Sequence, residues 1–234
     1  MVDTDDLARL RSYQARFAEA IEQSPPATPV PTCGDWSVRE LVEHLADIYT
    51  WAAHRAGGPS VRVDATDDLS ADYRRAGSVL IAALDDLDPD LPCWTLLDDD
   101  APKEHPRIGT VRFWHRRQAN ETLVHLWDLD HACGRVTDGI DDTEWFDCLS
   151  EVTQVMGPRQ VRLARVALPA VRVKFHPFDH APVVMPSLAD AATIVVHGSA
   201  AELALLAWGR RDASGLQVEG DVESLRTALR GMVP

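Results

Sequence analysis

Apolar residues in the first half of the chain recur every three or four positions, which is the spacing of amphipathic helices. The first such repeat, in residues 4–23, comprises Leu7, Leu10, Tyr13, Phe17 and Ile21. The segment SPPATPVP follows it and favours a turn, because proline interrupts a helix. We therefore expect the first helix over residues 4–23.

Four further helices are expected before residue 157. The best signalled lies in residues 33–55, where Ser37 and Glu40 form a capping box ahead of a helical apolar repeat. The other three are expected at residues 70–87, 110–132 and 143–155. Gly134 and the Gly157-Pro158 pair are expected to end the last two, and the acidic stretch around Asp98, Asp99 and Asp100 is expected to be a long loop.

The pattern changes beyond residue 157. Residues 167–175 and 192–199 are rich in β-branched side chains, which is typical of strands, and residues 216–221 predict a shorter one. Helical repeats lie at residues 200–211 and 222–231. This order predicts an α+β fold with two domains. We expect an up-down helical bundle over residues 1–157 and a small mixed α/β domain over residues 158–234.

Composition narrows the possible partners. With 45% hydrophobic and 26% charged residues, the chain reads as a globular protein, and its formal net charge is −14. This charge argues against nucleic-acid or anionic membrane partners, since phosphate binding needs clustered Lys and Arg. The sequence has no apolar run of about 18 residues, the length that a membrane-spanning helix needs. The acidic start MVDTDDLARL is unlike a signal peptide. We expect a cytoplasmic protein that is a monomer or a homodimer.

Three residues combine into a candidate metal site. Glu121 and His125 are four positions apart on one predicted helix, so both can reach one ion, although such pairs are commonly solvated or salt-bridged. His44 faces the apolar side of an earlier helix, where a core histidine bonded to a carbonyl is the alternative. If these helices are neighbours, the three side chains form a set of three ligands with one open position, as catalytic metals have.

Two segments, PTCGDWSVRELVEHL and FWHRRQANETLVHLWDLD, resemble the signature segments of the mycothiol-dependent maleylpyruvate isomerase family. The matching positions are Cys33, Trp36, Ser37, Val38, Leu41, His44 and Leu45, then Arg116, Arg117, Glu121, Thr122, Val124, His125, Trp127 and Asp128. Landmarks of the family's C-terminal domain recur at Gly198, Leu203, Trp208 to Arg210 and Gly220 to Asp221. The resemblance implies a DinB-like bundle with zinc ligands at His44, Glu121 and His125. Asn120 stands where many relatives have histidine, which concerns the substrate pocket more than the metal.

The resemblance also implies a chemistry. Zinc with an open position lowers the pKa of a bound thiol, here that of mycothiol, a low-molecular-weight thiol of actinobacteria. The thiolate would add to the double bond of a small electrophile, rotation would follow, and elimination would give the isomer. A mycothiol S-transferase of detoxification or biosynthesis would use the same sulfur without eliminating it. A third reading is a non-catalytic module that binds a metal or a small molecule.

Three more residues have candidate roles. Asp128 could hold the second ring nitrogen of His125 or orient a water, and its alternative role is an exposed ion pair. Arg117 could fix Glu121 or meet an anionic cosubstrate, and the alternative is a helical salt bridge. Arg210 matches the family's W-G-R landmark and could bind an anionic substrate, or else interact with a helix end. The catalytic candidates are therefore Glu121, Asp128 and Arg210, with Arg117 as a cofactor-binding candidate.

Other signals favour structural interpretations. His176 and His180 lie in the segment HPFDH, where Pro177 disfavours the helix that would bring them together, so a surface turn is expected. The four cysteines contain no C-x-x-C pair and are expected to be free thiols. Cys33 could be a nucleophile, but no pattern supports a Cys-His dyad, and a buried thiol is the more common case.

Overall fold

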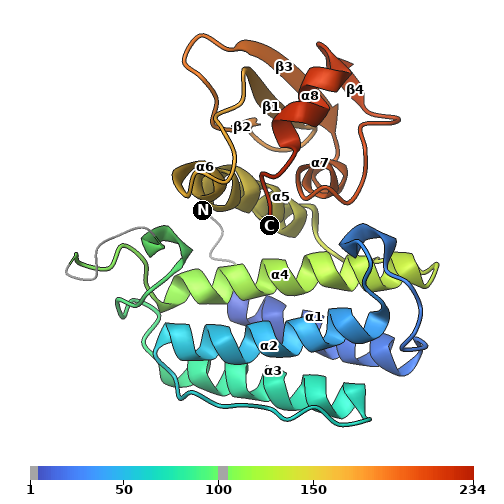
Figure 1. Cartoon of the computed structure of the whole chain (residues 1–234), viewed down its shortest axis with the longest axis vertical. Helices are drawn as coiled ribbons and strands as arrows, with labels where there is room; N and C mark the ends of the chain where they lie inside the picture. Colours follow the sequence, from blue (N-terminus) through green and yellow to red (C-terminus); the bar gives the residue numbers. More distant parts are fainter. Residues whose placement is uncertain (1–4, 100–104) are drawn as a thin grey trace. The chain divides into compact units, whose positions relative to one another are not determined.

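The computed structural model describes residues 5–99 and 105–234, and the chain divides into two compact units, Met1–Asp138 and Gly139–Pro234 (Figure 1). Of the acidic stretch expected as a loop, Asp100 lies outside the described residues. The α+β fold class is confirmed, with a helical bundle first and a small mixed sheet second. The boundary expected near residue 157 falls inside the second unit, because the helix at residues 142–151 packs against a helix of that unit.

The first unit is built from four helices. They are α1 (Asp6–Glu22), α2 (Val38–Ala56), α3 (Leu69–Asp86) and α4 (Val111–Ala132). Helix α2 packs against α3 and α4, and α1 packs against α3 and α4. Two short 3₁₀ turns, η1 (Pro31–Cys33) and η2 (Leu96–Asp98), lie in the connections that lead into α2 and α4. The helix bounds predicted from the apolar repeat agree with these to within a few residues.

Local sequence explains where α2 begins and ends. The capping box of Ser37 and Glu40 is present, with the Ser37 amide donating to Glu40 at 2.8 Å. At the other end Gly57 adopts a left-handed conformation with φ +114°, which favours glycine. Between these ends the apolar repeat is buried, so the position of His44 along α2 is fixed by both caps and core.

The second unit begins with a helix that continues past the end predicted at residue 155. Helix α5 (Asp142–Glu151) continues through a π-helical turn, η3 (Val152–Met156), into α6 (Gly157–Arg162). The expectation that Gly157-Pro158 stops the helix is therefore wrong. In the π turn the Gly157 amide donates to Val152, five residues back, and Pro158 falls in the first turn of α6, where its missing N–H costs little.

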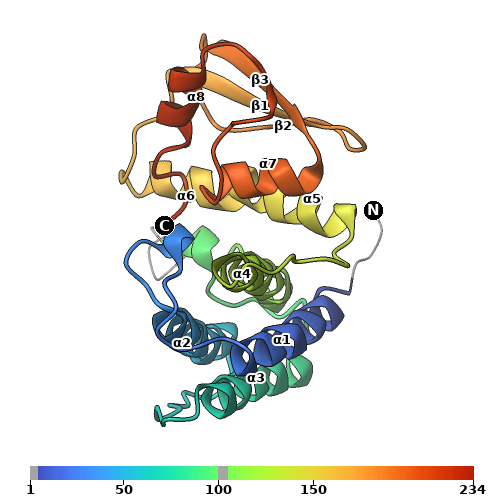
Figure 2. The ribbon, with the colours of Figure 1, turned by 90° about the vertical axis from the view of Figure 1, so that its right-hand side faces the viewer.

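A four-stranded mixed sheet completes the second unit, in the order β2-β1-β3-β4. Figure 2 shows β1, β2 and β3 of this sheet. The strands are β1 (Val171–Pro177), β2 (Val183–Val184), β3 (Ala192–Gly198) and β4 (Gln217–Glu219). Strands β1 and β3 are parallel, and β2 and β4 pair with them antiparallel. Helices α7 (Ala200–Ala207) and α8 (Val222–Leu229) contact this sheet, whose buried side chains include Val173, Phe175, Ile194 and Val196.

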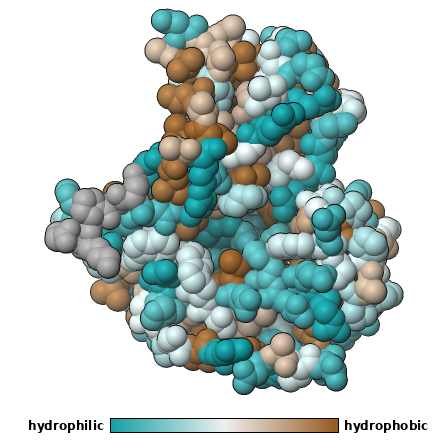
Figure 3. Space-filling view, viewed as in Figure 1, coloured by the Kyte–Doolittle hydropathy of each residue, from teal (hydrophilic) through white to brown (hydrophobic). Residues whose placement is uncertain are grey.

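The surface agrees with the composition. Hydrophilic side chains cover most of the visible face of the first unit (Figure 3), as a net charge of −14 suggests. Among the described residues, every helix is too short or too polar to cross a membrane.

Candidate functional site

Helices α2 and α4 bring the three proposed metal ligands together. Nε2 of His44 lies 3.3 Å from Oε1 of Glu121, and Nε2 of His125 lies 3.5 Å from the same oxygen. One donor atom from each of the three side chains falls within 4.8 Å of the others. Zinc bonds of about 2.0–2.1 Å in a tetrahedron place neighbouring donors about 3.3–3.4 Å apart. Both distances to Oε1 of Glu121 match such an ion.

The carboxylate of Glu121 is held from both sides. Its Oε2 accepts from Nη2 of Arg117, one helical turn earlier, which leaves Oε1 facing the two histidines. Burial opposes ionisation of this carboxyl, but Arg117, His125 and His44 together outweigh it and hold its pKa well below the ordinary value. Glu121 is therefore an anion in the folded protein, as a metal ligand must be.

Asp128 fixes the orientation of His125. Its Oδ2 lies 2.9 Å from Nδ1 of His125, one turn away on α4, and the Asp128 side chain is fully buried. A carboxylate on one ring nitrogen leaves the other nitrogen as the acceptor, which is how histidine ligands of metals are commonly held. Of the two roles considered for Asp128, its contact is with His125 and its side chain is buried rather than in an exposed ion pair, whereas its part in any chemistry stays a prediction.

Two donors from η1, neither of them predicted from the sequence, hold Asp128 in turn. Oγ1 of Thr32 donates to Oδ1 of Asp128 at 2.6 Å, and Sγ of Cys33 donates to its Oδ2 at 3.3 Å. Thr32 and Cys33 lie 96 and 95 positions before Asp128 in the chain. No local spacing signals a contact across such a distance; only the PTC segment next to a predicted ligand helix hinted at it.

The electrostatics of His125 reflect these neighbours. Burial favours the neutral ring, but Asp128, Cys33 and Glu121 outweigh burial and raise the pKa of His125 well above its usual value. The His125 ring is therefore protonated, and its positive charge lies between the carboxylates of Asp128 and Glu121. A metal ion at Nε2 would replace that proton.

Aromatic packing defines the more open side of the cluster. The ring of Trp36 lies 4.8 Å from that of His44, and the rings of His44 and His125 are 5.2 Å apart, edge to face. The His44 side chain keeps 29% of its exposure, whereas Glu121 and His125 keep 10% and 8%. His44 is therefore the most exposed of the three proposed ligands.

The remaining predicted residues lie elsewhere. Arg210 follows α7 in the second unit, where Nη1 donates to the carbonyl of Trp208 at 2.9 Å. Asn120 is fully buried, and its Oδ1 accepts from Nη2 of Arg9 at 3.2 Å. In the HPFDH segment, the His176 ring lies 4.9 Å from His197, while His180 bonds to Asp142 at 2.8 Å. The two histidines thus have separate partners.

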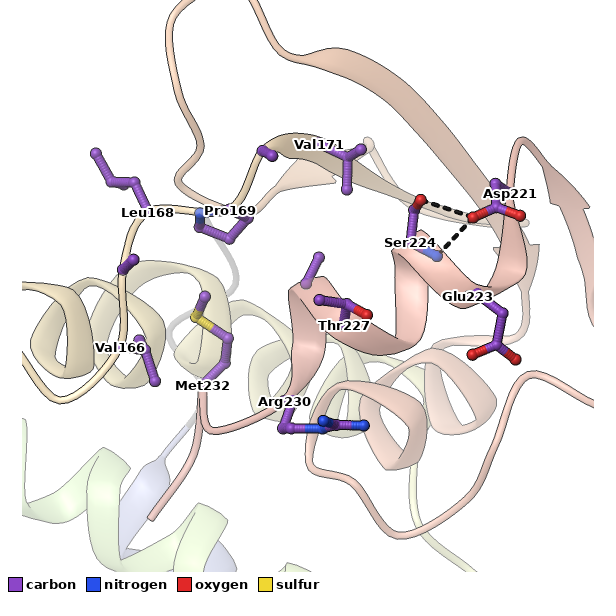
Figure 4. Close-up of a pocket in the computed structure, with 13 residues that line it drawn as sticks. Val166, Leu168, Pro169, Val171, Asp221, Glu223, Ser224, Thr227, Arg230 and Met232 are labelled. Atoms are coloured by element: carbon purple, nitrogen blue, oxygen red, sulfur yellow. Dashed lines mark hydrogen bonds between the residues drawn. The ribbon is translucent and has the colours of Figure 1, made fainter.

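A separate cavity of about 550 Å³ lies in the second unit between α8 and residues 166–171 (Figure 4). Its wall is mainly apolar and includes Val166, Leu168 and Met232. Asp221, one of its polar residues, accepts from the amide and the hydroxyl of Ser224 at 2.8 and 2.6 Å and so caps α8. Because the Asp221 carboxylate is engaged in capping the start of α8, this cavity offers less chemistry than the cluster on α2 and α4.

Comparison with known proteins agrees with the motifs. No curated protein matches this chain. A crystal structure of the mycothiol-dependent maleylpyruvate isomerase aligns with 93% of this chain and 94% of its own, with a TM-score of 0.64 and 14% sequence identity. At that identity the likeness shows the fold alone. Residues 7–130 match the family of the mycothiol maleylpyruvate isomerase N-terminal domain. This match covers more than half of the chain and includes both signature segments, so the chain belongs to that family.

Proposed function

We propose that this chain is a mycothiol-dependent isomerase of the maleylpyruvate type, with a divalent metal, zinc in the first instance, held by His44, Glu121 and His125. The observation that carries the proposal is the spacing of the three donors, 3.3 and 3.5 Å about Oε1 of Glu121, on two helices of the bundle. The family match supports the choice of thiol and reaction class. The similar fold of a solved isomerase is consistent with it.

Each neighbouring residue has a task in this proposal. Arg117 holds Oε2 of Glu121 and keeps Oε1 directed at the histidines. Asp128 keeps the proton of His125 on Nδ1, so that Nε2 is the free acceptor. Zinc bound there supplies the positive charge that keeps a thiol ionised at neutral pH. Arg117 is also the proposed contact for an anionic cosubstrate.

The reaction conserves the thiol. The sulfur of mycothiol forms a bond to one carbon of the conjugated double bond, and the displaced electron pair moves toward the adjacent carbonyl. Rotation about the resulting single bond and cleavage of the same C–S bond give the trans isomer and the original thiol. The substrate is anionic and the protein is strongly acidic, so a cation must meet it; Arg210 is the proposed residue.

Metal analysis tests the ligand set. We expect one equivalent of zinc in the purified chain and its loss in His44→Ala and His125→Ala. His54→Ala on α2 and His131→Ala on α4 are matched controls, because each removes an exposed imidazole from the same helix and should keep the metal. A wild-type chain that stays metal-free when grown with ample zinc would contradict the proposal.

Measurement of the thiol concentration during turnover tests the reaction. With maleylpyruvate and mycothiol, we expect turnover that leaves the thiol concentration unchanged and is abolished by Glu121→Ala, with a native circular dichroism spectrum. Stoichiometric loss of thiol would instead identify an S-transferase. Absence of mycothiol binding by calorimetry would favour a non-catalytic binding module.

A further inference from the structure

We propose a second metal site on the other side of His125, formed by Cys33, His125 and Asp128, which takes a thiophilic divalent ion such as Cd²⁺. One donor atom from each of these three residues lies within 4.8 Å of the others. Sγ of Cys33 is 3.3 Å from Oδ2 of Asp128, and Nδ1 of His125 is 2.9 Å from the same oxygen. This set shares only His125 with the set on Glu121.

The spacing needs only a small expansion to hold an ion. In a tetrahedral zinc site, the nitrogen and oxygen donors lie about 3.4 Å apart and the sulfur and oxygen donors about 3.6 Å apart. Each observed distance must therefore widen by less than about 0.5 Å, and somewhat more for the larger Cd²⁺. Cys33 is half-buried on the short turn η1, so its side chain can adjust and an ion can reach it.

Charge and softness distinguish the two sets. The set on Glu121 has two neutral imidazoles and one carboxylate, and so leaves a divalent ion with one net positive charge. The second set has a thiolate and a carboxylate, and neutralises the ion completely. Thiolate ligands select soft metals, whereas nitrogen and oxygen donors suit the harder ones. The second set therefore discriminates for Cd²⁺ and similar ions. Binding there releases the thiol proton of Cys33 and the Nδ1 proton of His125 to water.

The two sites compete because they share one imidazole. A neutral imidazole has a lone pair on only one ring nitrogen, so it binds one ion and donates a proton from its other nitrogen. An ion on Nδ1 takes the place of the Asp128 hydrogen bond that directs Nε2 toward Glu121. Occupation of the second site thus weakens the first, which makes Cys33 a point of sensitivity to soft metals.

A cadmium titration of the metal-free full-length chain, read by thiolate-to-cadmium charge-transfer absorption, tests the proposal. We expect a saturable band at one equivalent in the wild type and in His44→Ala, which lacks a ligand of the first site only. Cys33→Ser, which replaces a thiol by a hydroxyl of similar size, and Asp128→Asn should weaken binding at least tenfold or abolish the band. Cys133→Ser is the matched control, because Cys133 is also half-buried but belongs to neither ligand set.

The outcomes separate this proposal from the proposed function. A band that persists in Cys33→Ser, or that disappears in Cys133→Ser, would overturn the second site. So would a band lost in His44→Ala, since cadmium would then depend on the first ligand set. The zinc content of Cys33→Ser is measured beside it: retained zinc with no cadmium band supports two distinct sets, even if the chain proves inactive toward maleylpyruvate.

Discussion

Helices α4 and α7 are both largely buried, but they are buried by opposite means. Along α7 the buried side chains are all apolar: Ala200, Leu203, Ala204, Leu205, Leu206 and Ala207. Along α4 the buried side chains include many polar ones: His115, Arg117, Gln118, Asn120, Glu121, Thr122, His125, Asp128 and Asp130. Helix α7 is therefore an ordinary core helix, whereas α4 carries polar and charged groups that a core does not need.

The difference shows how a buried polar residue can point to a site. Burying a charge costs several kcal/mol unless it is paired and hydrogen-bonded, and several buried polar side chains of α4 have such partners. Glu121 has Arg117, His125 has Asp128, and the Thr122 hydroxyl lies 2.7 Å from that of Tyr49. Thr122 and Tyr49 fit a structural network. The connected set around Glu121 and His125 has metal-ligand chemistry, and that set makes α4 unlike α7.

The largest expected effect comes from making α4 resemble α7. Glu121→Leu removes the carboxylate from a buried ion pair with Arg117 and should lower the free energy of unfolding by about 3–5 kcal/mol. The double variant Arg117→Met with Glu121→Leu should regain most of this stability, because apolar residues replace both charges, but it should bind no zinc. Urea unfolding of the metal-free proteins checks the prediction. A double variant no more stable than Glu121→Leu would contradict it.

The next effect tests α7 by itself. Leu203→Ala deletes a fully buried side chain and should lower the free energy of unfolding by about 2–5 kcal/mol through the cavity that it leaves. Zinc affinity should not change, because no ligand lies on α7. Unfolding curves and zinc titrations on the same preparation measure both quantities. A change of more than a few-fold in the zinc dissociation constant would show that core packing at α7 also affects metal binding at α4.

The fold was largely predictable because its signals are local. The apolar repeat gave the bundle helices, and the capping box of Ser37 and Glu40 gave the start of α2. The continuation of α5 through Pro158 was not predictable, since a π turn depends on packing that a proline rule does not contain. Strand β2 has two residues, too few for a period to be seen.

The candidate site was predictable where ligand spacing and helix pairing were enough. Glu121 and His125 are one turn apart, and His44 needed only that α2 and α4 be neighbours. Thr32 and the Asp128 contact of Cys33 could not be found, because they depend on how η1 folds onto α4. The metal role of the set stays a prediction that the zinc analysis tests.

Thr32 therefore provides a test of intermediate size. Thr32→Val keeps the shape of the side chain but removes a donor from the buried Asp128, which holds His125. Loss of an outer hydrogen bond of this kind lowers metal affinity about 10–100-fold, or about 1.4–2.7 kcal/mol. Thr32→Ser should restore it, and Thr50→Val, which removes an exposed hydroxyl from α2, should have no effect. Zinc titration with a competing chelator measures the change. Full zinc affinity in Thr32→Val would contradict the role of Thr32 in holding Asp128 and His125.

The smallest effect concerns the one charged residue of α7, which lies in its first turn. Oε2 of Glu202 accepts from the amide and hydroxyl of Ser199 at 3.0 and 2.9 Å. The Ser199 amide, more than any other neighbour, lowers the pKa of Glu202 below the ordinary value of 4.5. Burial opposes this shift, and the Ser199 hydroxyl and Arg211 lower the pKa further. A lowered pKa stabilises the fold at pH values above 4.5 and loses that contribution as pH falls through the folded-state pKa.

Glu202→Gln should therefore lower the free energy of unfolding by less than about 1 kcal/mol at neutral pH, since the side chain is partly exposed. The difference from wild type should shrink toward zero as the pH falls below 4.5, because the wild-type carboxyl is then neutral too. Glu223→Gln on α8 is the control for the change in net charge. Urea unfolding as a function of pH measures the difference. If the difference in the free energy of unfolding between wild type and Glu202→Gln instead grew as the pH fell, protonation of Glu202 would not explain the pH dependence. The stabilising polar contacts of α7 would then extend beyond its N-terminal cap.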